Sequence, residues 1–304
     1  MNTPLDNIDD AATSDLPWEV AKTLSSIPFR QALYRIRFAE LALMRDWIKP
    51  QDSVLEIGGS TGFQSHFLRR WCREVVAIDI ASREKSESFA PVIEYDGSHI
   101  PFPDQSFDVV CSSLTLPMLE DREALPRLIR EMQRVLKDDG VTVHLVPTPM
   151  WSVWSALFHP VVMLERAFRR VIGRSKIASK ASFTSSGSSA RNERGSRWSV
   201  GILFRPPIGE RRSVLHELLS YRRNAWIHAF ETQGFEVIAF DPGRLFYTGQ
   251  LRFGMLPMVV RRGLSHLLGS STCVLAAKKR RAAGVQRSVE REIGATEQML
   301  ERAS

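Results

Sequence analysis

The stretch that most constrains the fold is Ser53–Gly62, which reads Ser-Val-Leu-Glu-Ile-Gly-Gly-Ser-Thr-Gly. Val54, Leu55 and Ile57 form a short apolar run that ends in small residues, and this pattern predicts a strand, a tight loop and then a helix that together grip a ligand. Glu56 lies where the strand gives way to the glycines. A carboxylate there would repel a pyrophosphate, and it would suit a ligand that carries an ammonium group.

Apolar runs alternate with helical patterns on both sides of this loop. Beyond the strand that begins at Ser53, we expect strands at 74–80, 92–96, 107–113 and 141–148, and helices at 63–71 and 122–137, the second capped by Asp121 and ended by Gly140. This alternation argues for a parallel α/β sheet. Ligands bind such sheets at the carboxyl ends of the strands, where Glu56, Asp79 and Asp96 all fall.

The rhythm of the chain differs outside this region. Residues 18–48 have a helical pattern that Pro28 splits, whereas 173–199 are rich in Ser, Gly, Lys and Arg and predict a loop. Farther on, the pattern predicts a helix over 215–233 that Gly234 stops, and strands at 235–240 and 272–277. These two strands bring the expected sheet to seven.

One segment before the fourth strand narrows the interpretation. Residues 100–108 read Ile-Pro-Phe-Pro-Asp-Gln-Ser-Phe-Asp. With the glycine loop, Asp79 and Asp96, this segment resembles the class I S-adenosylmethionine-dependent methyltransferases, and more narrowly the type 11-like methyltransferase domain. A GxGxxG dinucleotide fingerprint is absent, because Phe63 stands where its last glycine would fall, and this argues against a nicotinamide enzyme.

The resemblance implies a Rossmann-like α/β fold with a seven-stranded, mostly parallel sheet and helices on both faces. It divides the chain into an N-terminal helical extension (1–50), a cofactor-binding core (51–149), an acceptor-side insertion with a basic loop (150–214), the C-terminal part of the fold (215–278) and a charged tail (279–304). The implied activity is methyl transfer from S-adenosylmethionine to a small-molecule or lipid-linked acceptor.

The resemblance also implies roles for single residues. Glu56 and the loop would hold the methionine part of the cofactor, Asp79 the ribose hydroxyls and Asp96 the adenine amino group. The implied cofactor-binding residues are Glu56, Gly58, Gly59, Ser60, Gly62, Asp79, Ile80, Asp96, Gly97, Ser112 and Leu114. Ser60 stands where the family has its middle glycine, and serine is small enough for binding to survive with a shifted loop.

No general base and no metal site stand out in the sequence. The histidines at 99, 144, 159, 216 and 228 are scattered, and we expect each to be structural. Asp108 precedes a buried strand and is expected to anchor a loop. Holding donor and acceptor in line can carry a methyl transfer, so a missing base does not argue against activity. The three cysteines are far apart in sequence and predict buried thiols in a reducing, cytoplasmic compartment.

The charge differs between the two halves of the chain. Residues 1–150 hold 16 Lys and Arg against 23 Asp and Glu, a net charge of −7, whereas residues 151–304 hold 25 against 11, a net charge of +14. An RNA or protein methyltransferase that uses the basic half stays an alternative, although nucleic acid is not the expected partner because the basic residues are mixed with bulky aliphatics. A non-catalytic module that binds S-adenosylmethionine is the second alternative.

The basic half also contains two apolar stretches. Residues 141–164 hold no charged residue, but the fifth strand and three prolines argue against a membrane span there. We expect instead an interfacial helix at about 150–172, with Trp and Phe in the headgroup layer and three arginines on anionic lipid, and a companion at 244–268. Peripheral contact with the inner membrane face would bring the protein to a lipid-linked acceptor.

Overall fold

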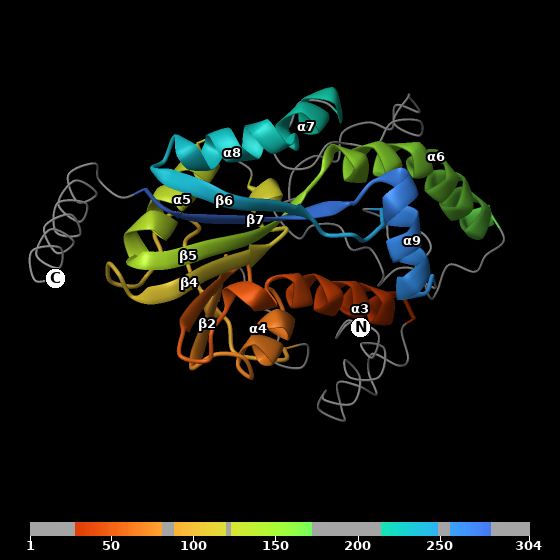
Figure 1. The fold of residues 1–304 in the computed structure, drawn as a ribbon. Coiled ribbons are helices and arrows are strands. Elements are labelled where there is room, and N and C mark those ends of the chain that lie inside the picture. The colour runs from red at the N-terminus through yellow and green to blue at the C-terminus, as the bar shows by residue number, and fades with distance from the viewer. Residues whose placement is uncertain (1–27, 81–87, 120–122, 172–213, 249–255, 281–304) are drawn as a thin grey trace, which may run out of the picture.

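The computed structural model describes residues 28–80, 88–119, 123–171, 214–248 and 256–280, and its strands form one seven-stranded sheet (Figure 1). These are β1 (Ser53–Ile57), β2 (Glu74–Asp79), β3 (Ile93–Glu94), β4 (Phe107–Ser113), β5 (Leu136–Pro147), β6 (Phe235–Pro242) and β7 (Thr272–Lys279). Their order is β3-β2-β1-β4-β5-β7-β6. Strands β1 to β5 are parallel, and β7 runs antiparallel to β5 and β6. The mostly parallel seven-stranded sheet expected from the sequence is thus confirmed.

Helices cover both faces of this sheet. Figure 1 shows α3 (Pro28–Leu43) and α4 (Phe63–Leu68) on one face, and α5 (Ala124–Val135), α7 (Val214–Ser220) and α8 (Arg223–Glu231) on the other. All five residues of β1 are buried, as expected for a parallel strand between two helical layers. Consecutive side chains of a strand point to opposite faces of the sheet. Within β1, Val54 therefore packs in the hydrophobic core that contains Phe67 of α4, and Leu55 packs in the core that contains Met132 of α5.

The boundary between α5 and β5 differs from the sequence prediction. The helix ends at Val135 and β5 already begins at Leu136, so Gly140 lies inside the strand and does not cap the helix. A Cβ at Gly140 would lie 2.9 Å from the carbonyl oxygen of Asp108, so the glycine allows a close approach of two strands. Asp108 itself accepts hydrogen bonds from the Ser53 backbone N–H (2.9 Å) and from Lys137 (2.8 Å), and is the expected anchor.

The helix predicted over 215–233 is two helices. The chain leaves the helical conformation at Arg222, which is extended (φ −65°, ψ 147°), and α8 begins at the next residue. Tyr221 stacks on Trp226 at a centroid distance of 6.2 Å, so the break places two buried aromatic rings against each other. Gly234 follows α8 with φ +83° and ends the helical region as expected.

Two helices lie at the carboxyl ends of the parallel strands (Figure 1). One is α6 (Pro149–Val171), which follows β5 and confirms the helix expected at about 150–172, and the other is α9 (Met258–Leu268), which precedes β7. The Trp154 side chain joins them, because its indole N–H donates to the carbonyl oxygen of Leu268 at 2.9 Å. Within the part of the chain that the structure describes, no helix is long and apolar enough to cross a bilayer.

A buried polar group joins α3 to this end of the molecule. The Tyr247 hydroxyl donates to the carboxylate of Glu40, which also accepts a hydrogen bond from Arg37 at 2.8 Å. Glu40 is fully buried and lies 207 residues from its tyrosine partner in sequence. The predicted N-terminal extension therefore packs on the body of the fold through α3.

Some expectations concern residues that lie outside the described parts of the chain. These are the helical pattern before Pro28, the Asp121 cap, the basic loop at 173–199, the middle of the apolar stretch at 244–268 and most of the tail at 279–304. The three cysteines are described, and Cys72, Cys111 and Cys273 are buried and free, as expected.

Candidate cofactor-binding site

The loop after β1 is held by the neighbouring strand and by Thr115. The backbone N–H groups of Gly58 and Gly59 both donate to the Ile78 carbonyl oxygen of β2, at 2.8 and 3.0 Å. Gly58 has φ +80°, and a Cβ on it would lie 2.1 Å from the Thr115 hydroxyl oxygen. Only glycine fits this position, because the left-handed conformation and the close side chain both exclude a Cβ.

Ser60 adopts the conformation that the resemblance would assign to glycine. Its φ is +51°, in the left-handed region. Its backbone N–H donates to Asp79 Oδ2 at 2.7 Å, so the end of β2 fixes the loop directly. Ser60 therefore keeps the backbone conformation of a glycine although it departs from the family pattern. Its Cβ makes this left-handed conformation strained.

The end of the loop is packed as closely as its beginning. Gly62 has φ +72° and precedes α4, and a Cβ on it would lie 2.4 Å from the Ala90 carbonyl oxygen. The Phe89 backbone N–H donates to the Thr61 carbonyl oxygen at 2.7 Å. At both glycines other parts of the protein occupy the place of a side chain, the Thr115 side chain at Gly58 and the Ala90 backbone at Gly62, so both positions require glycine.

Glu56 is a buried acid beneath this loop. Only 2% of its surface is exposed, and its carboxylate accepts a hydrogen bond from the Ser65 hydroxyl of α4. Burial raises the pKa of Glu56 to about 7, because the charged form loses its hydration, and the Ser65 hydrogen bond opposes this rise. The negative charge of Asp79 adds to the rise. A cation bound nearby would favour the ionised form.

Asp79 and Asp96 lie at the ends of the next two strands along the edge. Asp79 Oδ1 accepts a hydrogen bond from the Ile80 backbone N–H at 2.7 Å, in addition to the bond from Ser60. The Tyr95 backbone N–H donates to the Asp79 carbonyl oxygen at 3.0 Å, so β2 and the residues before Asp96 are adjacent. A carboxylate has about four acceptor positions, so Asp79 keeps capacity for a ligand's hydroxyl groups.

Asp96 belongs to an exposed turn. Its Oδ1 accepts hydrogen bonds from the backbone N–H groups of His99 (2.8 Å) and Ser98 (2.7 Å), which hold the pKa of this carboxyl below its usual range. Gly97 has φ +77° and a Cβ on it would lie 3.0 Å from Ile80, whose side chain is exposed beside it. An apolar side chain next to a charged acceptor suits an adenine ring.

Ser112 and Leu114 are placed differently from one another. The Ser112 side chain is fully buried and its hydroxyl is hydrogen-bonded to His144 Nδ1 at 2.8 Å. Burial lowers the pKa of His144 to about 3, so this histidine is neutral and structural, as expected. Leu114 has φ +55° and precedes Thr115, the residue that contacts Gly58, so its backbone lies beside the loop.

Three residues of this region were not singled out from the sequence. Thr115 closes on Gly58 and donates to the Ile57 carbonyl oxygen (3.0 Å), Ser65 holds Glu56, and Tyr95 lies next to both acids. Burial raises the pKa of Tyr95 to about 12, and the Asp79 and Asp96 charges add to it. Of these three residues, only Ser65 could have been found from the sequence. A buried acid needs a hydrogen-bond donor, and Ser65 lies in the first turn of the helix that follows the loop.

The segment 100–108 is held by α5. Arg134 donates to the carbonyl oxygens of Ile100 and Phe102, both at 2.8 Å, and to Asp104 at 2.9 Å. Glu131 accepts from the Ile100 backbone N–H at 2.9 Å. These contacts anchor the segment that carries the family resemblance, and so they support the turn at Asp96 that precedes it.

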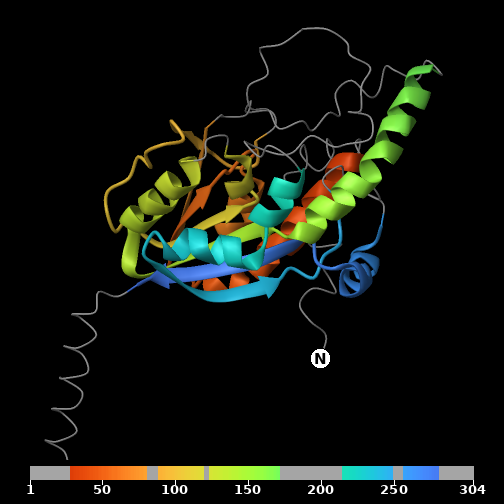
Figure 2. The ribbon, with the colours of Figure 1, turned by 90° about the horizontal axis from the view of Figure 1, so that it is seen from above.

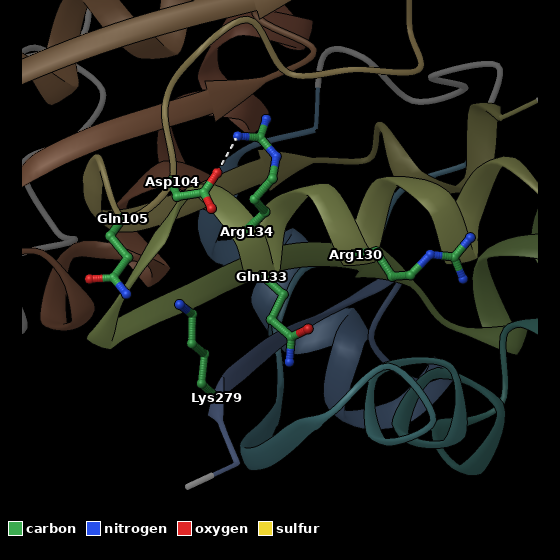
Figure 3. Close-up of a pocket in the computed structure, with 6 residues that line it drawn as sticks. All are labelled: Asp104, Gln105, Arg130, Gln133, Arg134 and Lys279. Atoms are coloured by element: carbon green, nitrogen blue, oxygen red, sulfur yellow. Dashed lines mark hydrogen bonds and ion pairs between the residues drawn. The ribbon is translucent and has the colours of Figure 1, made fainter. Parts of the chain in front are cut away.

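A polar hollow of about 290 Å³ lies beside this anchor, and Figure 3 shows the residues that line it. It is lined by Asp104, Gln105, Arg130, Gln133, Arg134 and Lys279. The hollow lies where β4 and β5 begin and the antiparallel β7 ends, which is the opposite edge of the sheet from the glycine loop. It is therefore separate from the candidate cofactor site.

Comparison with known proteins gives a family for this part of the chain. Residues 55–144 match a family model described as a methyltransferase domain. A demethylmenaquinone methyltransferase of Corynebacterium efficiens is 32% identical over 123 residues, which are 38% of this chain and 51% of that protein. A malonyl-[acyl-carrier protein] O-methyltransferase of Halorhodospira halophila is 35% identical over 100 residues, 30% of this chain and 33% of that protein.

Other similar proteins carry less specific names. An uncharacterized protein of Methanocaldococcus jannaschii is 32% identical over 36% of this chain and 43% of its own length. The chain thus spans between a third and about half of the length of these three relatives. A solved S-adenosylmethionine-dependent methyltransferase from Mesorhizobium loti is 15% identical, with a TM-score of 0.46 over 79% of this chain and 98% of that one. Residues 55–144 of this chain, which contain the glycine loop, Asp79 and Asp96, thus match the model of a methyltransferase domain.

Proposed function

We propose that this chain transfers a methyl group from S-adenosylmethionine to a small-molecule or lipid-linked acceptor. The observation that supports it most is the arrangement at one edge of the sheet, where Glu56, Asp79 and Asp96 lie at or just beyond the carboxyl ends of three adjacent strands, next to the glycine loop. Small residues, two acids that can accept hydrogen bonds and a buried acid that a cation would ionise fit a ligand with an ammonium group, a sulfonium and a nucleoside. S-adenosylmethionine supplies the activated methyl group.

Each residue then has a task. The Glu56 carboxylate and the loop from Gly58 to Gly62 hold the methionine part, and Asp79 accepts hydrogen bonds from the ribose hydroxyls. Asp96, Gly97 and Ile80 form the adenine side. The backbone at Ser112 and Leu114 lies between the cofactor and the acceptor. We assign no side chain as a general base, and the rate enhancement comes from holding donor and acceptor in line.

The acceptor class is argued from the insertion. Both α6 and α9 lie at the carboxyl ends of the strands, where an acceptor would enter. The acceptors named in two relatives, a malonyl-acyl-carrier protein and demethylmenaquinone, are consistent with a small or carried group. We place the protein in the cytoplasm, in peripheral contact with the inner membrane face.

Calorimetric titration with S-adenosylmethionine tests the cofactor assignment. Asp79→Ala should weaken binding by about tenfold to a hundredfold, because hydrogen bonds to a charged group contribute about 1.5–3 kcal/mol. Glu236→Ala is the matched control, since Glu236 is an exposed acid on β6, at the opposite end of the strand order from β2 and β3. Failure of the wild-type protein to bind S-adenosylmethionine would refute the proposal.

A second experiment identifies the acceptor. The protein is incubated with methyl-labelled S-adenosylmethionine and with membrane, soluble or RNA fractions. Label in the membrane or small-molecule fraction supports the proposal, and label in RNA or protein supports the alternative that uses the basic half. Binding without transfer to any fraction would favour a non-catalytic module.

A further inference from the structure

Exposed apolar side chains gather on three helices at one end of the molecule. Nine of the thirteen exposed large hydrophobic residues that the structure describes lie on α6, α7 and α9, so their distribution is not even over the surface. They are Val153, Leu157, Val161, Leu164, Leu215, Leu219, Val259, Val260 and Leu267, called here the apolar surface. Clusters of this kind mark interaction sites, whereas single exposed hydrophobic residues do not.

The four members on α6 form one stripe. Val153, Leu157, Val161 and Leu164 are spaced by four, four and three residues, which places them on one helical face. The opposite face is used for packing, since Trp151, Ser152 and Ser155 are buried. Figure 2 shows that α6 extends beyond the other helices and strands of the fold.

Helix α9 repeats this arrangement beside α6. Its exposed members Val259, Val260 and Leu267 fall on one face, and Leu267 is 82% exposed. Arg261, on another face, is buried and donates to the Phe246 carbonyl oxygen at 3.0 Å. The hydrogen bond from the Trp154 indole to the Leu268 carbonyl oxygen places the end of α9 beside α6.

The charges on these helices select the kind of partner. The sequences of α6 and α9 together contain five arginines, of which Arg261 is buried, and one acidic residue, Glu165. In the half of the chain that holds these helices the net charge is +14. In a dimer formed through these helices, two positively charged surfaces would face and repel each other. Anionic lipid headgroups would instead attract the positive charge.

From the stripes and the charges we propose that the apolar surface inserts into the interface of a bilayer that contains anionic lipids. This inference rests on the proposed function, because membrane contact would serve methyl transfer only if the acceptor enters at this end of the sheet. The valines and leucines of the apolar surface enter the acyl boundary, and the basic charge of this half of the chain attracts the anionic headgroups. A lipid-linked acceptor can then reach the strand ends from the bilayer.

Vesicle flotation with the full-length protein tests this inference. Wild-type protein should float with vesicles of phosphatidylcholine and phosphatidylglycerol, and less with phosphatidylcholine alone. The double variant Leu157→Asn/Leu164→Asn should bind the anionic vesicles about tenfold more weakly or worse, because two side chains no longer bury apolar area. These leucines are 59% and 67% exposed, so their replacement leaves the core intact. Ile238→Asn is the matched control, at an exposed position of β6 outside the apolar surface.

The outcomes separate this inference from the proposed function. Loss of flotation in the double variant and retention in Ile238→Asn support it. Absence of wild-type flotation, or a double variant that floats as well as wild type, overturns it. A dimer in light scattering that the double variant dissociates overturns it as well, since a second copy then covers the surface. S-adenosylmethionine titration of all three proteins reports on the cofactor site alone, so its failure would refute the proposed function and not the membrane contact.

Discussion

The buried Glu56 gives the sharpest prediction about stability. Folding raises its pKa from the ordinary 4.5 to about 7. The folded state therefore holds the proton more tightly than the unfolded chain. The stabilisation from Glu56 is fully present below pH 4.5 and is lost as the pH rises through about 7. At about 1.36 kcal/mol for each pKa unit, the loss between about pH 4 and pH 8 amounts to about 3 kcal/mol.

The variant Glu56→Gln isolates this effect. Glutamine keeps the shape and can still accept from the Ser65 hydroxyl, but it does not ionise. Urea unfolding followed by tryptophan fluorescence, at a series of pH values, gives the free energy of unfolding of both proteins. Wild type minus variant should fall by about 3 kcal/mol between about pH 4 and pH 8. A difference that stays constant across this range would refute the reasoning.

Two further measurements sharpen the test. The Ser65 hydrogen bond lowers the pKa of Glu56, so Ser65→Ala should move the loss of stability to a higher pH. If the methionine ammonium binds near Glu56, then binding at about pH 6 should release a proton, because the cation favours the ionised carboxylate. Calorimetry in two buffers of different ionisation enthalpy measures this release. Proton uptake on binding would contradict the placement of the cation.

Two other variants test single contacts of the fold. Ser60→Gly should raise the free energy of unfolding by about 0.5 kcal/mol, because relief of the left-handed φ exceeds the entropy that glycine loses on folding; a variant that is less stable than wild type in urea would show that Ser60 is not strained. Tyr247→Phe should lower the free energy of unfolding by about 2 kcal/mol, since the fully buried Glu40 loses a donor while packing is kept. The control is Phe240→Tyr, which adds a hydroxyl at a half-buried position of β6. If Tyr247→Phe is as stable as the wild type, the hydrogen bond between Tyr247 and Glu40 does not form.

Local sequence patterns predict much of the fold. The apolar run before the glycines predicted β1, and the alternation that followed predicted a parallel sheet, because each strand must be buried between helices. The acids at Glu56, Asp79 and Asp96 could be placed at one edge without coordinates, since the carboxyl ends of parallel strands meet there. The sequence does not decide between two possible roles of one residue: the pattern around Gly140 predicts a helix cap, whereas in the structure this glycine allows a close contact between β4 and β5.

Residues far apart in sequence were paired only by the tertiary structure. No periodicity connects Glu40 with Tyr247, or Arg134 with the carbonyl oxygens of the segment it anchors, because these bonds depend on how the helices pack on the sheet. The raised pKa of Glu56 likewise comes from burial under a loop and not from its neighbours in sequence. The composition indicates that the second half of the chain is apolar and basic. Only the packing of α6 and α9 at the end of the sheet decides which of its apolar side chains are buried in the core and which form an exposed stripe.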